Sequence, residues 1–200
     1  FLFFLRFLSD TKSIRKLENW PSYGNPEIGK QLSNGRYIFS GVQFDLDVDN
    51  PWLIEIPSSE VEQSLYGFSW LNDFSALGSS KARNCAVDWL KKWHSYNSFG
   101  KKGNWSAEIT AKRCINLVRN WHFLNGGSNK YNEICSKNLW RQYRFLKLML
   151  AVFPHGLQKI KILYSVFVLA SAFDVSNRSQ KNILKKLLQA LQGFIGSSVQ

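Results

Sequence analysis

The residues of this chain whose types and spacing suit ligand chemistry lie on one predicted helix and just before it. Trp105 precedes this helix, and Arg113, Asn120 and His122 lie on it. Arg113 and Asn120 are separated by about two helical turns, so their side chains share one face. A guanidinium and an amide hydrogen-bond a carboxylate, and an indole packs on the apolar face of a sugar ring. We therefore expect these residues to contact a uronic acid sugar.

The same segment also has a purely structural interpretation. Trp121 is adjacent to His122 and lies two positions after Arg119. If the helix buries this indole in the core, the guanidinium and the imidazole flank it as amphipathic residues at the border of the apolar face. The sequence leaves both interpretations open.

The sequence lacks the common motifs for nucleophilic, metal-dependent and nucleotide chemistry. It contains no GxSxG, no HExxH and no Walker loop. Asp45, Asp47 and Asp49 alternate in DLDVDN, but the following glycine and the distal glutamate of a calcium loop are missing. We therefore predict no catalytic residue, no metal site and no cofactor in this chain.

Cysteine usage agrees with that prediction. Cys85, Cys114 and Cys135 form no CxxC pair, and each lies among apolar residues of a predicted helix. Such cysteines behave as small buried hydrophobes. We expect buried free thiols, with neither a disulfide framework nor a zinc site.

The composition indicates a globular chain that attracts polyanions. Its 26 Lys and Arg residues outnumber its 14 Asp and Glu residues, which gives a net charge of +12. Nucleic acid, an anionic membrane and acidic polysaccharide are the partners that such a charge attracts. The cations form no run of five, unlike those of a nucleic-acid-binding tail. Aromatic residues make up 15% of the chain, enough for a large core and for lining a ligand groove.

No segment is predicted to span a membrane, which takes about 20 apolar residues. The opening FLFFLRFL is too short, and the apolar segment 160–173 is interrupted by Lys161 and Ser165. Because the chain begins without methionine, we interpret the opening as the tail of a signal sequence or the end of a helix in a fragment.

Residues 58–200 are predicted to form one helical domain. Apolar residues recur there at steps of three or four, and Ser59 with Glu62 fits a capping box at the first helix. A nearly all-apolar helix alternates with more polar ones, which favours two layers, as in an α/α barrel or toroid, with a plain helical bundle as the alternative. The six predicted helices span about residues 60–77, 80–96, 107–125, 130–153, 157–173 and 177–194.

Residues 1–57 are predicted to form an N-terminal arm packed on the helical body. Residues 19–57 hold four of the five prolines, and turn signals at 34–35 and 40–41 bound β-type segments at 36–39 and 42–48. We expect a small β-hairpin or extended arm that docks through Trp20 and Trp52.

Several segments together carry a family resemblance through their order. They are WPSYGNPEIGKQLSNGRYIFSG (20–41), Pro51-Trp52, LYGFSWLNDF (65–74), Trp105, KRCINLVRNWHFL (112–124) and PHGLQKIKILYSVFVLASAF (154–173). In this order the chain resembles, over nearly its whole length, the N-terminal helical region of bacterial heparinase II/III-like polysaccharide lyases.

The resemblance implies an incomplete α/α toroid, followed in full-length relatives by a C-terminal β-sandwich domain, and a periplasmic location. Those relatives cleave acidic, uronate-containing polysaccharides, such as glycosaminoglycans, by β-elimination. An asparagine or histidine neutralises the uronate carboxylate, a tyrosine or histidine removes the C5 proton, and a tyrosine protonates the leaving oxygen. Offsetting the carboxylate charge is what makes the C5 proton acidic enough to remove.

The chain departs from the family where the helical catalytic residues are expected. In the relatives these residues follow the helix that corresponds to 177–194, in a Gly-Gly-His or asparagine-rich stretch. Here the sequence reads LQGFIGSSVQ. No catalytic residue can be carried over, so we expect an inactive fragment or a degenerate member.

Two other classes of function fit the composition. A non-enzymatic basic helical module could bind nucleic acid, because interleaved lysines and tryptophans suit bases as well as sugars. Such binding would weaken steeply with salt. A helical adaptor would instead bind a protein partner on a concave apolar face.

Overall fold

The computed structural model describes a mostly helical chain with one small antiparallel sheet, which confirms the predicted α class and its β-hairpin. The described residues are 12–14, 20–21, 23–44, 50–96, 105–125, 129–153 and 155–197. In chain order the elements are α1 (Pro26–Ser33), β1 (Tyr37–Phe39), β2 (Val42–Phe44), the 3-10 helix η2 (Pro51–Leu53), α2 (Ser59–Tyr66), α3 (Trp70–Leu77), α4 (Ser80–Tyr96), α5 (Ala107–Arg119), α6 (Trp121–Leu124), α7 (Asn129–Val152), α8 (Gly156–Ala172) and α9 (Asn177–Ser197).

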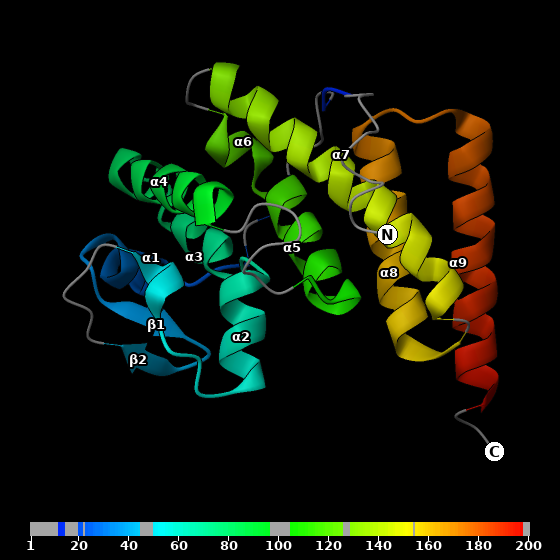
Figure 1. The fold of residues 1–200 in the computed structure, drawn as a ribbon, viewed down its shortest axis with the longest axis horizontal. Coiled ribbons are helices and arrows are strands. Elements are labelled where there is room, and N and C mark those ends of the chain that lie inside the picture. Colours follow the sequence, from blue (N-terminus) through cyan, green and yellow to red (C-terminus); the bar gives the residue numbers. More distant parts are fainter. Residues whose placement is uncertain are drawn as a thin grey trace.

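Helix α5 lies between two groups of elements (Figure 1). The hairpin gathers with α1, α3 and α4 on one side, and α7, α8 and α9 pack together on the other, with α8 and α9 antiparallel. α5 contacts α3 of the first group, the adjacent α2, and α7 and α8 of the second group. A hydrophobic core with members from the hairpin through α8 runs through both groups, and α5 packs on both.

Residues 26–33 form a helix where the proline-rich composition predicted an extended arm. The side-chain oxygen of Asn25 accepts a hydrogen bond from the backbone N–H of Glu27 at 2.9 Å, and Pro26 occupies the first turn. Proline favours this position, because its missing N–H and fixed φ suit a helix start. No helix was predicted here, because the prolines and turn residues of 19–57 favoured a hairpin or an extended arm.

α1 packs on α3 with its backbone in direct contact. A Cβ at Gly29 would lie 2.3 Å from the carbonyl oxygen of Asp73, and a Cβ at Gly24 would lie 2.0 Å from that of Asn72. The backbone N–H of Asn25 also donates to the Asp73 carboxylate at 2.8 Å. Only glycine fits at such a close approach.

The helix predicted at 60–77 is divided into α2 and α3. Phe68, between them, has a φ of +58°, which bulky residues rarely adopt. The Phe68 side chain is fully buried. Across the break, the Trp70 Nε1–H donates to the Leu65 carbonyl oxygen at 3.1 Å. The apolar periodicity continues through the break, which is why the sequence predicted one helix.

The two predicted N-caps, those of α2 and α5, were located to within one residue. Ser58, not Ser59, caps α2, because its Oγ accepts from the Val61 N–H at 3.3 Å. Ser106 caps α5 and accepts from the Ile109 N–H at 3.2 Å. The third predicted helix is divided into α5 and α6.

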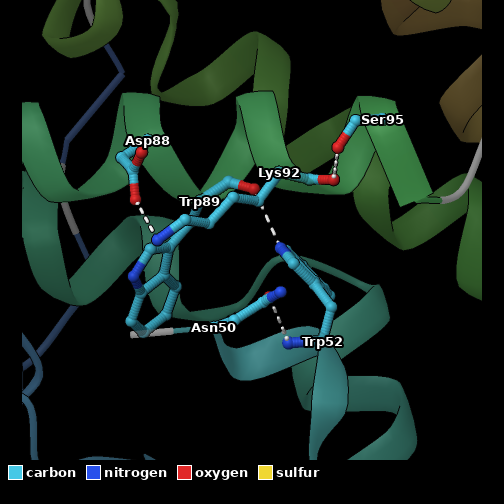
Figure 2. A network of polar contacts seen from close by, with 6 residues as sticks. All are labelled: Asn50, Trp52, Asp88, Trp89, Lys92 and Ser95. Carbon is cyan, nitrogen blue, oxygen red and sulfur yellow. Dashed lines mark hydrogen bonds and ion pairs between the residues drawn. The ribbon is translucent and has the colours of Figure 1, made fainter. Parts of the chain in front are cut away.

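The segment before α2 is fixed to α4 by one tryptophan (Figure 2). The Trp52 backbone N–H donates to Asn50 Oδ1 at 3.2 Å and closes the start of η2. Its indole Nε1–H donates to the Trp89 carbonyl oxygen at 2.9 Å. In the same view Lys92 pairs with Asp88 at 2.7 Å along α4. The indole bond therefore joins two elements, whereas the ion pair supports a single helix.

The hairpin packs on α4 through one face of β1. Tyr37 and Phe39 are buried, and their ring centroids lie 5.5 and 6.2 Å from that of Trp89. Tyr37 pairs with Phe44 across the sheet. The predicted continuation of the second strand falls on 45–49, outside the described residues, as do the alternating aspartates.

The last two helices differ in burial. α8 is buried on most sides, as predicted. α9 buries Leu187 but leaves Leu184, Leu188 and Leu191 exposed, with accessible fractions of 38%, 52% and 36%. None of the described helices combines the length and hydropathy needed to cross a membrane.

Replacing Gly29 by alanine is expected to lower the free energy of unfolding by about 1–3 kcal/mol, because the added Cβ collides with the backbone of α3. Gly193→Ala in α9 is the control. Its Cβ meets nothing within 4 Å, and helix propensity should raise stability by about 0.5–1 kcal/mol. Urea unfolding followed by circular dichroism measures both. A G29A protein as stable as the parent would contradict the close backbone contact.

Candidate functional site

The structure brings together only part of the group of residues that the sequence predicted as sugar contacts. Arg113 and Asn120 are buried, with exposed fractions of 0% and 4%. Trp105 is half-buried directly before α5, and His122 is exposed on α6. These four side chains therefore do not form one open surface, and the two that were expected to hold a carboxylate face the core.

The guanidinium of Arg113 lies in a box of aromatic rings. Its Cζ is 4.8 Å from the ring centroid of Trp93, 4.9 Å from that of Trp105 and 5.6 Å from that of Phe68. Cation–π attraction is stronger in such a desolvated place than at a surface. Trp105 and Arg113 are thus neighbours, and the indole is one wall of the box.

Hydrogen bonds from Arg113 join three helices. Nε donates to Gln142 Oε1 on α7 at 2.8 Å, Nη1 donates to the Tyr66 carbonyl oxygen of α2 at 3.1 Å, and Nη2 donates to Thr110 Oγ1 on α5 at 3.2 Å. Burial lowers the pKa of Arg113 to about 10, so the group is still cationic at neutral pH. One charge therefore ties α2, α5 and α7 together.

A series of asparagines fixes α5 to the break between α2 and α3. Asn116 Nδ2 donates to the Gly67 carbonyl oxygen at 2.7 Å, and Asn72 Nδ2 donates to Asn116 Oδ1 at 3.2 Å. Asn120 Nδ2 donates to Asn72 Oδ1 at 2.9 Å. Asn116 could have been found from the sequence, because it shares a helix face with Arg113 and Asn120.

The box and the asparagine series have a structural role in this conformation. A polymer carboxylate could reach Arg113 only if the aromatic walls separated, which would expose apolar surface and break the bonds to α2 and α7. In this conformation Arg113 and Asn120 therefore offer no surface contact to an anionic polymer.

A groove between α7, α8 and α9 offers surface cations. It has a volume of about 700 Å³, and its lining includes His155, Lys159, Lys186, Gln189 and Phe194. It combines two ammonium groups with amide, imidazole and aromatic groups, whereas the set predicted around Trp105 had a guanidinium and an indole. The sequence did not reveal this groove, because its cations lie on two different helices that are brought together by tertiary packing.

The described residues offer no group of three His, Cys, Asp or Glu side chains that could hold a metal ion. Cys114 and Cys135 are buried free thiols, and Cys85 is half-buried. Burial raises the pKa of Cys114 to about 12, which keeps this thiol protonated and unreactive.

No protein-family model, no curated protein and no solved structure matches this chain.

His94 lies next to the aromatic box and is held neutral. Its Nδ1 accepts a hydrogen bond from Asn138 Nδ2 at 3.1 Å, and its ring centroid is 5.1 Å from that of Trp93. Burial, and then the nearby Arg113 cation, lower the pKa of His94 to about 4. A folded-state pKa below the unfolded value of 6.5 means that the folded protein binds this proton more weakly than the unfolded chain does.

We expect the free energy of unfolding to fall as the pH drops from about 6.5 to about 4, by up to about 3 kcal/mol from His94. Above pH 6.5 this contribution is fully present. His94→Gln should flatten the profile in this window, whereas His122→Gln at an exposed position should leave it steep. Urea unfolding at a series of pH values measures this pH dependence of the free energy of unfolding. Equal slopes for H94Q and the parent would contradict the assignment.

Arg113→Lys is expected to lower the free energy of unfolding by about 2–4 kcal/mol. An ammonium cannot replace a planar fork that bonds to three helices, so buried acceptors lose their donors. Arg141→Lys, an exposed position on α7, is the matched control and should change stability by less than about 0.5 kcal/mol. Urea unfolding measures the free energy of unfolding of both variants. A loss in R113K as small as that in R141K would contradict the stabilising role of Arg113 in the aromatic box.

Proposed function

We propose that this chain is the helical N-terminal part of a heparinase II/III-like polysaccharide lyase and that its basic body binds an acidic, uronate-containing polysaccharide. The observation that carries the proposal is the ordered run of segments that resemble this family. Residues 20–41 include α1 and β1, 65–74 cover the α2–α3 break, 112–124 include most of α5 and all of α6, and 154–173 include α8.

These segments supply two of the larger helix contacts of the fold. α1 packs on α3, and α5 packs on α8. A sequence pattern that reflects a shared architecture is expected at such packed positions, because core packing restricts residue choice. The segments therefore support a common fold more than a common set of catalytic groups.

The arrangement of α8 and α9 supports an incomplete α/α toroid as part of this proposal. In a toroid, inner helices are buried and outer helices are amphipathic. α8 is mostly buried, and α9 has buried and exposed faces. The antiparallel pair that they form is the repeating unit such an architecture requires (Figure 1).

The groove between α7, α8 and α9 is the proposed polymer contact. Lys159 and Lys186 can pair with carboxylates, and Phe194 offers an apolar face to a sugar ring. Its volume of about 700 Å³ is in the range of small-molecule sites. The net charge of +12 adds long-range attraction for an anionic chain.

The double substitution K159Q/K186Q is expected to weaken the binding of hyaluronan oligosaccharides by about tenfold or more, because two charge-assisted contacts are lost. The control K91Q/K137Q removes the same charge from α4 and α7, away from the groove lining, and should have a much smaller effect. Isothermal titration calorimetry at fixed salt measures both.

Duplex DNA serves as the competing ligand in that experiment. Tighter binding to DNA than to hyaluronan, or equal losses from the two double substitutions, would contradict the proposal and favour a general polyanion-binding module. The lyase assignment is tested on the product of the complete gene. Ultraviolet absorbance of unsaturated uronate should appear on an acidic polysaccharide, and no product across a broad panel would contradict it.

A further inference from the structure

A second cavity lies between α2, α5 and α8, apart from the groove described above. Its volume is about 290 Å³, and its wall includes Ile109 and Ile115 beside Lys112, Lys161 and Tyr164. The volume is at the small end of ligand sites, which run from about 300 Å³. It suits a small molecule and excludes a polymer segment of several sugars.

Two ammonium groups and one carboxylate share this cavity. Lys161 on α8 forms an ion pair with Glu108 on α5. Lys112 lies one helical turn after Glu108, and the charges of Glu108 and Lys161 both act on its pKa. Burial lowers the pKa of Lys112, attraction from Glu108 opposes this shift, and the weaker repulsion from Lys161 adds to it. The cluster of Lys112, Lys161 and Glu108 has one more positive than negative charge, so it favours an added anion.

The stem of Lys112 is held in place by α2. A Cβ at Gly67 would lie 2.9 Å from Lys112 Cδ and 3.2 Å from its Cγ, so the methylene chain packs directly on the backbone at the end of this helix. Lys112 as a whole is an exposed residue, and it lines the cavity together with Lys161.

We propose that this cavity binds a small organic anion with an apolar body, such as an arylalkyl carboxylate. The carboxylate pairs with Lys112 and Lys161, and the apolar body packs on Ile109 and Ile115. An inorganic anion would leave the apolar wall in water, and a neutral hydrocarbon would leave the ammonium groups without the charge they favour.

The probe is 3-phenylpropionate, and its neutral amide is the matched compound. Nuclear magnetic resonance titration of the parent protein should give saturable shifts with the carboxylate and affinity at least about tenfold lower with the amide. Lys112→Met keeps the stem that packs on Gly67 but removes the charge, and it should weaken carboxylate binding by about tenfold. Lys137→Met on α7 is the control and should leave the affinity unchanged.

Glu108→Gln gives a result in the opposite direction. It removes the carboxylate that competes for Lys161, so 3-phenylpropionate should bind at least about threefold more tightly. If K112M fails to fold, E108Q alone tests the proposal. An affinity of E108Q for 3-phenylpropionate equal to that of the parent would overturn it.

Equal affinities for the carboxylate and the amide, or an unchanged affinity in folded K112M, would also overturn it. Because K159Q/K186Q alters only the groove, this variant should bind 3-phenylpropionate like the parent. That result separates a failure of the cavity proposal from a failure of the polymer proposal, and a loss of binding in this variant counts against a separate site.

Discussion

The buried charge of Arg113 is the constraint on which the rest of the structure depends. A cation in a core is costly unless its donors are satisfied, so α2, α5 and α7 must meet with the Tyr66 carbonyl, Thr110 and Gln142 in place. The asparagine series then fixes the α2–α3 break against the same face of α5. Because α8 also packs on α5, the two proposed binding sites take their positions from this centre.

α8 shows how one helix can serve two separate sites. Lys159 lines the groove with α9, and Lys161 lines the cavity with α2 and α5. Residues two apart on a helix point about 200° away from each other. The short sequence KIK therefore presents one cation to each side of a mostly buried helix. Both proposed sites therefore use α8.

The features that could be predicted from the sequence were those written in local patterns. Periodicity found the long helices, and Ser106 was correctly assigned as a cap. The hairpin followed from its turn signals. The α2–α3 break was missed because Phe68 adopts a positive φ that only tertiary packing holds. The site was harder to predict, because spacing places Arg113 and Asn120 on one face without saying whether that face meets solvent or core. Gln142, which receives the Arg113 bond, lies on another helix.

The exposed leucines of α9 affect how copies of this protein associate in solution. Leu184, Leu188 and Leu191 expose apolar surface to water, which favours association between copies of the protein. The net charge of +12 opposes that association by electrostatic repulsion. Salt screens that repulsion over distances beyond about 10 Å at 0.1 M but leaves the hydrophobic attraction intact. We therefore expect added salt to promote self-association through this face of α9.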